Sequence, residues 1–318
     1  MAASKKQLKL LVTGGGGMLE STLTPLLRQR GHIVTALSKE ELDITDFARV
    51  NATIAELAPD LVLHCAAYTQ VDKAESEQDE AYLVNYTGTE NVAHACGKNN
   101  IGMLYVSTDY VFDGTGTTPY KTNDQTCPIS IYGKSKLAGE IAVVKNCPNF
   151  YRVRTSGLYG PFGRNFVDTI YKLASEKGTI QVVADQVGSP TSTATLSHMI
   201  AELIESGRTG VYHATDDGVT SWYEFAREIV KELTFNGSAI CVIPIDTCDM
   251  PRPAPRPAYS VLDKSDLISV LGRPLETWQE ALAKYKSEHL LKSARTSQIS
   301  ATQPDGDREK VNAGKASA

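Results

Sequence analysis

Three side chains in two stretches of the sequence could together transfer a proton. Thr108 ends an apolar run, and Tyr132 and Lys136 stand four residues apart further along the chain. A helix beginning at Tyr132 would place Tyr132 and Lys136 on one face. A free phenol has a pKa of about 10, and a neighbouring cation lowers it. A phenol beside an ammonium and a Thr hydroxyl is therefore a candidate proton donor at neutral pH, as the reduction of a carbonyl group requires. Alternatively, Tyr132 and Lys136 would be an ordinary pair of side chains on a surface helix. The strand-like run that ends at Thr108 disfavours this alternative.

These side chains need a scaffold, and the sequence predicts a parallel one. Short apolar runs at residues 8–13, 32–37, 61–66 and 103–107 read as strands, and helical spacing fills residues 18–30, 47–57 and 80–98. Such alternation indicates an α/β fold with a Rossmann-type, doubly wound parallel sheet. The strands are almost continuously apolar, which fits burial on both faces of the sheet.

The pattern loosens beyond residue 154. Strands are expected at residues 180–183 and 210–214, helices at 196–206, 222–233 and 275–286, and an extended, proline-rich segment at 251–257. We expect a cofactor-binding Rossmann domain of residues 6–157 plus about 190–215. A smaller substrate-binding domain would comprise about 158–189 and 216–290, and residues 291–318, almost without apolar side chains, would form a disordered tail.

Composition excludes several classes of function. The net charge is −5 and no run of basic residues occurs, so nothing supports nucleic-acid binding. No apolar stretch is long enough for a membrane span, and the N-terminus lacks the apolar core of a signal peptide, so we expect a cytoplasmic protein. The six Cys and six His are dispersed, without a Cys-x-x-Cys or a helical His pair, so no metal site is expected and the thiols are expected to be free.

A glycine run between the first strand and the first helix is a candidate dinucleotide site. Gly14 and Gly17 would let backbone N–H groups approach a pyrophosphate at the helix N-terminus, beside Met18 and Leu19. A third glycine normally follows three residues later, and here that position is Glu20. Either the helix sits further out with the carboxylate in solvent, or the cofactor binds less tightly.

The end of the second strand bears on the choice of cofactor. An acidic residue there would favour NAD, whereas Ser38 and Lys39 could accept the 2′-phosphate of NADPH. We predict NADPH, with NADH as the weaker alternative. Asp43 and Ile44 follow, and could hold adenine by one hydrogen bond and one apolar contact, although a helix cap at residues 43–46 explains them equally well.

The order of the motifs resembles the dTDP-4-dehydrorhamnose reductase family, which belongs to the extended short-chain dehydrogenases/reductases. The resemblance runs from about residue 8 to about residue 290. Its most specific pieces are Thr-Asp-Tyr-Val-Phe-Asp-Gly at residues 108–114 and Asp-Gln-Val-Gly-Ser-Pro-Thr at 185–191. Further matches lie at residues 42–46, 65–75, 84–85, 132–140, 154–156, 165–167 and 256–260.

The resemblance implies hydride transfer to the C4 ketone of a dTDP-linked 6-deoxysugar. By similarity, Tyr132 would donate the proton, Lys136 would bind the nicotinamide ribose and lower the pKa of Tyr132, and Thr108 would bond the reacting oxygen. Cofactor contacts are implied for Ala66, Ala67, Tyr68 and Asn85, and substrate contacts for Asp109, Tyr110, Val111, Asn165, Gln186 and Arg256. Purely structural roles are also possible for three of these residues. Asn85 could bridge two backbone segments, Tyr110 could pack in the core, and Arg256 could be a solvated charge.

The sequence departs from the family pattern at a second place besides Glu20. The family commonly has a Trp after its Arg-Thr-Ser, near the sugar, and here that residue is Gly157. Some members dimerise through a metal held by acidic residues that follow Gly-x-Pro-Thr; none follow here, so we expect a monomer, with a weak dimer as the alternative. Glu20 and Gly157 favour a second hypothesis, a non-catalytic dinucleotide-binding regulatory protein such as the methionine adenosyltransferase regulatory subunit. A third is another sugar-nucleotide reductase or epimerase.

Overall fold

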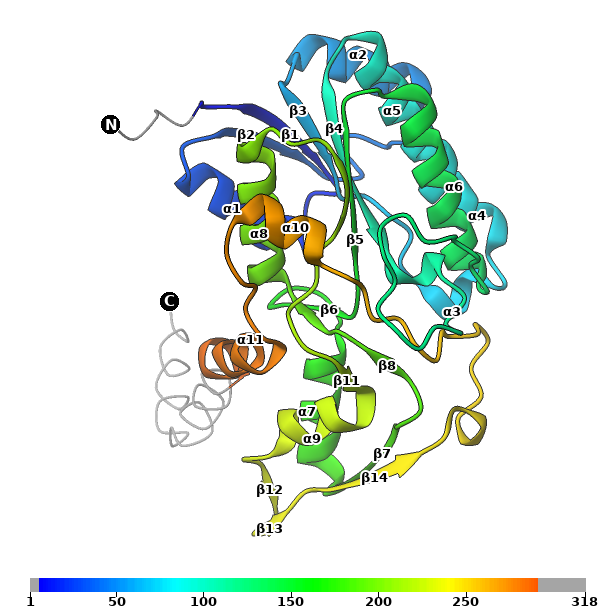
Figure 1. The fold of residues 1–318 in the computed structure, drawn as a ribbon, viewed down its shortest axis with the longest axis vertical. Helices are drawn as coiled ribbons and strands as arrows, with labels where there is room; N and C mark the ends of the chain where they lie inside the picture. The colour runs from blue at the N-terminus through cyan, green and yellow to red at the C-terminus, as the bar shows by residue number, and fades with distance from the viewer. Residues whose placement is uncertain (1–5, 291–318) are drawn as a thin grey trace, which may run out of the picture.

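A six-stranded parallel sheet forms the centre of the larger part of the molecule (Figure 1). The computed structural model describes residues 6–290. From edge to edge the strand order is β10-β5-β4-β3-β1-β2. The six strands are β1 (Lys9–Thr13), β2 (Ile33–Leu37), β3 (Leu61–His64), β4 (Gly102–Thr108), β5 (Phe150–Thr155) and β10 (Gly210–His213).

The point at which the strand order reverses lies between β1 and β3. From β1 the chain moves outward to β2, then crosses back to β3 on the other side of β1. Thr13 and His64 are register partners at the carboxyl ends of these two strands. In open α/β sheets the crevice outside such ends is where ligands bind.

Helices cover both faces of the sheet. On one face, α1 (Glu20–Gln29), α8 (Thr193–Ser206) and α10 (Ser265–Leu271) close one apolar core. On the other, α2 (Phe47–Leu57), α5 (Thr89–Lys98) and α6 (Ile131–Asn146) close a second core. The inner strands β1, β3 and β4 are buried on both sides, as their continuous apolar sequences predict, whereas the edge strand β2 is partly exposed. The predicted α/β class and doubly wound sheet are confirmed.

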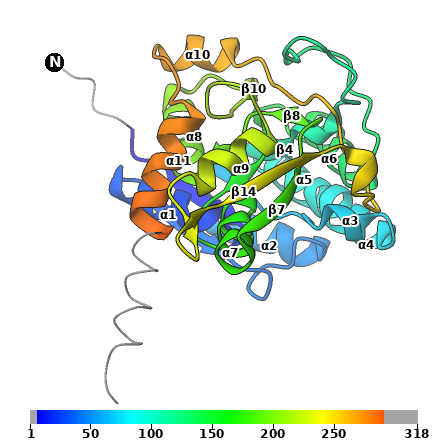
Figure 2. The same ribbon diagram turned by 90° about the horizontal axis from the view of Figure 1, so that it is seen from below.

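A smaller unit with its own core lies below the sheet in the view of Figure 1. It contains α7 (Phe166–Lys177), α9 (Trp222–Val230) and α11 (Trp278–Tyr285). Its strands β7 (Thr179–Val183) and β14 (Cys241–Ile245) pair in parallel and lie side by side in Figure 2. The remaining short pairs are β6 (Leu158–Tyr159) with β9 (Thr191–Ser192), β8 (Val187–Gly188) with β11 (Thr220–Ser221), and β12 (Thr234–Phe235) with β13 (Ser238–Ala239).

One predicted helix is interrupted. Residues 80–98 form the end of α4 (Gln78–Tyr82), a π-helical turn η1 (Leu83–Gly88), and α5. Close packing surrounds the turn, because a Cβ on Gly88 would lie 2.6 Å from the Ile44 side chain. A Cβ on Gly139 of α6 would likewise lie 2.4 Å from the Asn85 carbonyl oxygen. These are tertiary contacts, which helical spacing does not reveal.

The remaining elements are short. A helix α3 (Val71–Ala74) precedes α4, and a 3-10 turn η2 (Asp109–Val111) follows β4. A second 3-10 turn, η3 (Thr247–Asp249), follows β14, and a π-turn η4 (Lys286–Leu290) follows α11.

The predicted division into two domains stays a prediction. β10 and α8 belong to the large sheet and its cover, whereas α10, which falls within 216–290, packs against α8 and β10. The predicted tail at 291–318 lies outside the described residues. None of the described helices combines the length and the apolar character that crossing a membrane requires.

Candidate active site

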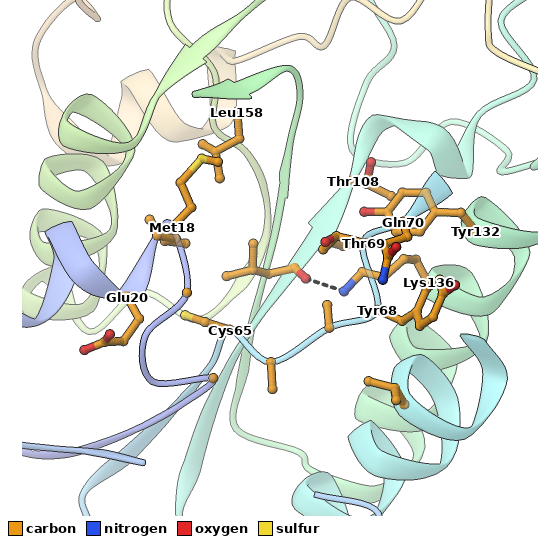
Figure 3. A pocket seen from close by; sticks show the side chains of 18 of the residues that line it. Met18, Glu20, Cys65, Tyr68, Thr69, Gln70, Thr108, Tyr132, Lys136 and Leu158 are labelled. Atoms are coloured by element: carbon orange, nitrogen blue, oxygen red, sulfur yellow. Dashed lines mark hydrogen bonds between the residues drawn. The ribbon is translucent and has the colours of Figure 1, made fainter. Parts of the chain in front are cut away.

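A cavity of about 940 Å³ opens at the carboxyl ends of the strands. It extends from the glycine loop after β1, past the end of β3, to the end of β4 and the start of α6 (Figure 3). The predicted residues that line it are Gly14, Gly17, Met18, Leu19, Lys39, Asp43, Ile44, Ala66, Ala67, Tyr68, Thr108, Asp109, Tyr110, Tyr132 and Lys136.

The start of α6 brings the phenol and the ammonium to one face. Ser130 caps the helix by accepting a hydrogen bond from the Gly133 N–H, so Tyr132 and Lys136 lie one turn apart. Gly133 is required for close approach, because a Cβ there would lie 2.2 Å from the Tyr110 carbonyl oxygen. The first turn of α6 therefore packs directly on η2, next to Thr108 at the end of β4.

Lys136 is buried and held by the backbone of β4. Its Nζ donates a hydrogen bond to the Val106 carbonyl oxygen at 2.7 Å and lies 4.2 Å from the centroid of the Tyr105 ring. Burial lowers the pKa of Lys136 to about 7, against the opposing attraction of Glu140. Lys136 therefore titrates within the physiological range.

The pKa of the Tyr132 phenol shifts in the direction opposite to the one that the sequence predicted. Burial raises its pKa to about 12, a hydrogen bond with Thr108 opposes that shift, and Asp109 adds to it. The expectation that Lys136 lowers the pKa of Tyr132 is wrong in this structure, because the ammonium is directed at the Val106 carbonyl. A protonated phenol at neutral pH is nevertheless the form that a proton donor needs.

The glycine loop has the shape of a dinucleotide cradle. A Cβ on Gly14 would lie 2.7 Å from the Ala66 nitrogen, and one on Gly15 would lie 2.8 Å from the Ser38 nitrogen. Gly16 has a φ of +79° and open space around its Cβ position. The helix that follows begins without a side-chain cap at Leu19, and the N–H groups of Ser21 and Thr22 already donate to the Gly17 and Leu19 carbonyls. An anion at this end of α1 would therefore meet the backbone of Met18 and Leu19, which line the cavity. These features fit the pyrophosphate of a dinucleotide.

Glu20 turns back on this loop. Its Oε2 accepts a hydrogen bond from the Gly16 N–H at 2.9 Å, and the residue is only 8% exposed. Of the two alternatives that the sequence left open, the one with the carboxylate in solvent is therefore wrong. A fixed negative charge instead lies on a donor of the loop that a phosphate would use.

The residues at the predicted adenosine end divide into two groups. Lys39 is exposed and lines the cavity, whereas Ser38 does not line it, and its N–H donates to Glu41 Oε2 at 2.8 Å. Asp43 accepts hydrogen bonds from the N–H and the hydroxyl of Thr45, which hold its pKa below the usual range. The cap of α2 is Asp46, not Asp43.

Asn85 lies behind the cavity and does not line it. Its amide accepts from the Tyr68 N–H at 2.8 Å and donates to the Tyr68 carbonyl at 3.0 Å and to Ser135 at 3.0 Å. This is the backbone bridge that the sequence left open as an alternative. Asn85 thus fixes the segment that carries Tyr68 into the cavity.

A second cavity of about 180 Å³ adjoins the first. The two share four lining residues: Asp109, Tyr110, Ser156 and Gly157. Asp109 is buried, accepts hydrogen bonds from Thr108 at 2.9 Å and Ser156 at 2.8 Å, and has its pKa raised by burial. Gln186 lines the second cavity and donates to Thr247.

Three predicted substrate residues lie outside both cavities. Val111 is fully buried in a small apolar cluster. Asn165 caps α7 through the Asp168 N–H and also bonds the Gly160 carbonyl. Arg256 forms a two-point ion pair with Asp72, at 2.9 and 3.0 Å. The structure gives Val111 and Asn165 packing and capping contacts, not contacts with a ligand space.

Several lining residues were missed by sequence reasoning. Cys65, Gln70 and Val71 adjoin predicted positions and could have been found from the motif at 65–75. Arg164 directly precedes the motif at 165–167, whereas Trp222 comes from a segment without a recognised motif. Only the tertiary fold brings them to the crevice.

Known proteins that are similar to this chain include reductases with a dinucleotide cofactor, in agreement with the geometry of the cavity. The family described as "RmlD substrate binding domain" matches residues 8–290. The dTDP-4-dehydrorhamnose reductase of Streptomyces griseus is 44% identical over 280 residues, covering 86% of this chain and 91% of that protein. The enzyme of the same name from Mycolicibacterium smegmatis is 42% identical over 277 residues, covering 86% and 84%. A solved dTDP-4-dehydrorhamnose reductase from Bacillus anthracis, in complex with NADP, has a TM-score of 0.84 and 38% identity, covering 89% of this chain and 100% of that one.

Proposed function

Since the chain belongs to the dTDP-4-dehydrorhamnose reductase family, we propose that it reduces the C4 ketone of a dTDP-4-dehydro-6-deoxy-L-sugar with NADPH. The product would be dTDP-L-rhamnose, a precursor for polysaccharides. The observation that carries this proposal is the placement of Thr108, Tyr132 and Lys136 at one end of a cavity whose other end is a glycine loop.

The reaction needs a proton at oxygen and a hydride at carbon. Bound NADPH supplies the hydride that adds to C4. Tyr132, protonated because burial raises its pKa, gives its proton to the C4 oxygen, and Thr108 bonds and orients that oxygen. Lys136, one helical turn from Tyr132 and lining the same cavity, would bind the nicotinamide ribose, as the resemblance implies. The carbonyl gains one hydride and one proton and becomes the alcohol, and the phenol regains its proton from water.

The cofactor contacts follow from the residues that line the cavity. The loop at Gly14 and Gly17 and the uncapped start of α1 suit the pyrophosphate. Lys39, exposed at the far end, suits the 2′-phosphate that distinguishes NADPH from NADH. Ser38 would contribute to NADPH binding only through the turn that positions Lys39, because the Ser38 N–H already donates to Glu41.

The test is a spectrophotometric assay. The purified protein is mixed with NADPH and dTDP-4-dehydro-L-rhamnose, and absorbance of the reduced nicotinamide is followed. We expect turnover in the wild type and a loss of about 10²- to 10⁴-fold in Tyr132→Phe, which removes the proton donor. NADPH binding without turnover above the Tyr132→Phe control would instead support the regulatory hypothesis.

Assembly and location are further parts of the proposal. The segment after the motif at 185–191 begins Ser192-Thr193-Ala194, without a carboxylate for a bridging metal, so we propose a monomer. Light scattering coupled to size-exclusion chromatography checks this. We also propose a cytoplasmic location, because the free Cys residues suit a reducing compartment. Cell fractionation checks that.

A further inference from the structure

An aromatic side chain from the smaller unit occupies the space beside Gly157. Gly157 lies just beyond β5 with a φ of +54°. A Cβ there would lie 3.1 Å from Trp222 Cη2 and 3.1 Å from Pro190 Cα. The absence of a side chain at residue 157 therefore admits the edge of the Trp222 indole.

The start of α9 fixes the backbone of Trp222, and aromatic neighbours pack against its ring. Trp222 is the first residue of α9, which Ser221 caps by accepting from the Glu224 N–H. The backbone N–H of Trp222 donates a hydrogen bond to the Gln186 carbonyl oxygen at 3.3 Å. Its ring lies 4.7 Å from the Phe166 ring, centroid to centroid. An aromatic ring that is fixed in this way forms a rigid wall at little entropic cost on binding.

The second cavity combines this wall with hydroxyl and carboxylate groups. Trp222 and Gly157 line it together with Asp109, Ser156 and Ser260. Aromatic faces suit the C–H face of a sugar ring, and hydroxyl and carboxylate groups suit its hydroxyls. The cavity lies close to the proton donor, because the Tyr110 ring, which also lines it, is 5.6 Å from the Tyr132 ring.

We propose that Trp222 is the aromatic wall against which the hexose of the sugar nucleotide lies, and that Gly157 makes room for it. This inference rests on the proposed function, since it assigns the sugar subsite of that same reaction. The hexose occupies the second cavity and presents its C4 oxygen toward Tyr132. The wall thus belongs to the smaller unit, while the proton donor belongs to the large sheet.

Steady-state kinetics test the role of Trp222 in sugar binding separately from the reduction step. Trp222→Ala is expected to raise KM for the sugar nucleotide about tenfold, which corresponds to about 1.4 kcal/mol of lost aromatic contact. KM for NADPH and kcat are expected to change less than about twofold. Trp222→Phe keeps a ring and should restore most of the affinity. An unchanged sugar KM in folded Trp222→Ala would overturn the proposal.

Fluorescence provides a readout that does not depend on turnover. The chain has two tryptophans, and the other, Trp278, is buried in the core of the smaller unit. Titration with dTDP-L-rhamnose should quench the wild type and Trp278→Phe, but not Trp222→Phe. Titration with dTDP alone should leave the Trp222 emission almost unchanged.

Two outcomes of the titration count against the wall. Equal quenching by dTDP alone would place thymine, not the hexose, against Trp222. Quenching that persists in Trp222→Phe would place the sugar elsewhere. Failure of the proposed function would look different: the wild type would show no NADPH oxidation, whereas the titration reports on Trp222 with or without turnover.

Discussion

At the scale of single residues, Lys136 links catalysis to stability. Burial lowers the pKa of its ammonium from 10.5 to about 7. Between these two pH values the unfolded chain binds more protons than the folded one. The cost of burying Lys136 is therefore fully present below pH 7 and declines as the pH rises toward 10.5.

We expect Lys136→Met to relieve this cost. The free energy of unfolding of Lys136→Met, minus that of the wild type, should be largest near pH 6 and should fall steadily toward about pH 10. Urea unfolding across this range measures it. Lys134→Met, which removes an exposed lysine of the same helix, controls for the loss of one charge. A difference that is independent of pH would contradict the lowered pKa.

Glu20 gives a second prediction at this scale. Its carboxylate holds the Gly16 N–H, so the dinucleotide competes with it for that donor and is repelled by its charge. We expect Glu20→Gly to bind NADPH about fivefold more tightly, a gain of about 1 kcal/mol from freeing the Gly16 N–H and removing the charge. Isothermal titration calorimetry measures this. Glu20→Gln keeps the acceptor without the charge and should fall between the two. Weaker binding by both variants would mean that Glu20 supports the loop more than it opposes the phosphate.

Lys39 gives a third, which concerns cofactor choice. It is exposed, lines the cavity and carries the charge suited to a 2′-phosphate. Lys39→Ala should lower the ratio of kcat/KM for NADPH to that for NADH about tenfold, since a charged hydrogen bond contributes on the order of 1.5 kcal/mol. Steady-state kinetics with both cofactors measure the ratio. An unchanged ratio would exclude Lys39 as the discriminating residue.

At the scale of elements, local signals explain what the sequence predicted correctly. The helix predicted at 47–57 coincides with α2, because Asp46 caps its start and Ala58, with a φ of 40°, ends it. The start of α6 at Ser130 follows the same logic and places Tyr132 and Lys136. Both depend on residues that are adjacent in the sequence.

Other elements depend on distant partners, and there the sequence was insufficient. The π-turn η1 follows from packing of Gly88 and Gly139 against distant residues. β14 reads as an ordinary mixed segment until it pairs with β7. Trp222 reaches the site only because α9 packs in the smaller unit next to residue 157. The sequence therefore predicted that Thr108, Tyr132 and Lys136 lie together, as they do at one end of the cavity, but it did not predict the shape of the second cavity.

The proline-rich segment 251–257 is tied to α3 through Asp72, which pairs with Arg256 and Arg252 and accepts a hydrogen bond from the Ala254 N–H. Arg256 binds Asp72 at two points, and both side chains are only partly exposed. The same segment places Pro257 in the second cavity. The pair therefore fixes one wall of the proposed sugar subsite.

We expect Asp72→Asn to raise KM for the sugar nucleotide at least as much as Arg256→Gln, because Asp72 also contacts Arg252 and the Ala254 N–H. The double variant should be no worse than Asp72→Asn alone, because that change already removes the pair with Arg256. Steady-state kinetics on the three variants measure this. A much larger effect of Arg256→Gln than of Asp72→Asn would instead show that Arg256 contacts the diphosphate directly, as the sequence suggested.

At the scale of the whole molecule, the order of the chain interleaves the two units. The chain leaves the large sheet after β5, enters the smaller unit, and returns to add α8 and β10. α8 covers α1, where Leu23 and Leu27 are completely buried in the core that Leu196 and Met199 complete. This packing supports the predicted cofactor domain of residues 6–157 plus about 190–215, which stays a prediction.

This interleaving makes a truncation informative. A fragment of residues 6–157 keeps the glycine loop, Tyr132 and Lys136, but loses the edge strand β10 and the cover of α1. Burying Leu23 or Leu27 contributes about 1.5–3 kcal/mol each, a large share of a typical domain's 5–15 kcal/mol of stability. We expect the fragment to lack cooperative thermal unfolding in circular dichroism and to bind no NADPH, whereas residues 6–290 should do both. A folded fragment that binds NADPH would show that the cofactor domain is contiguous and ends at residue 157.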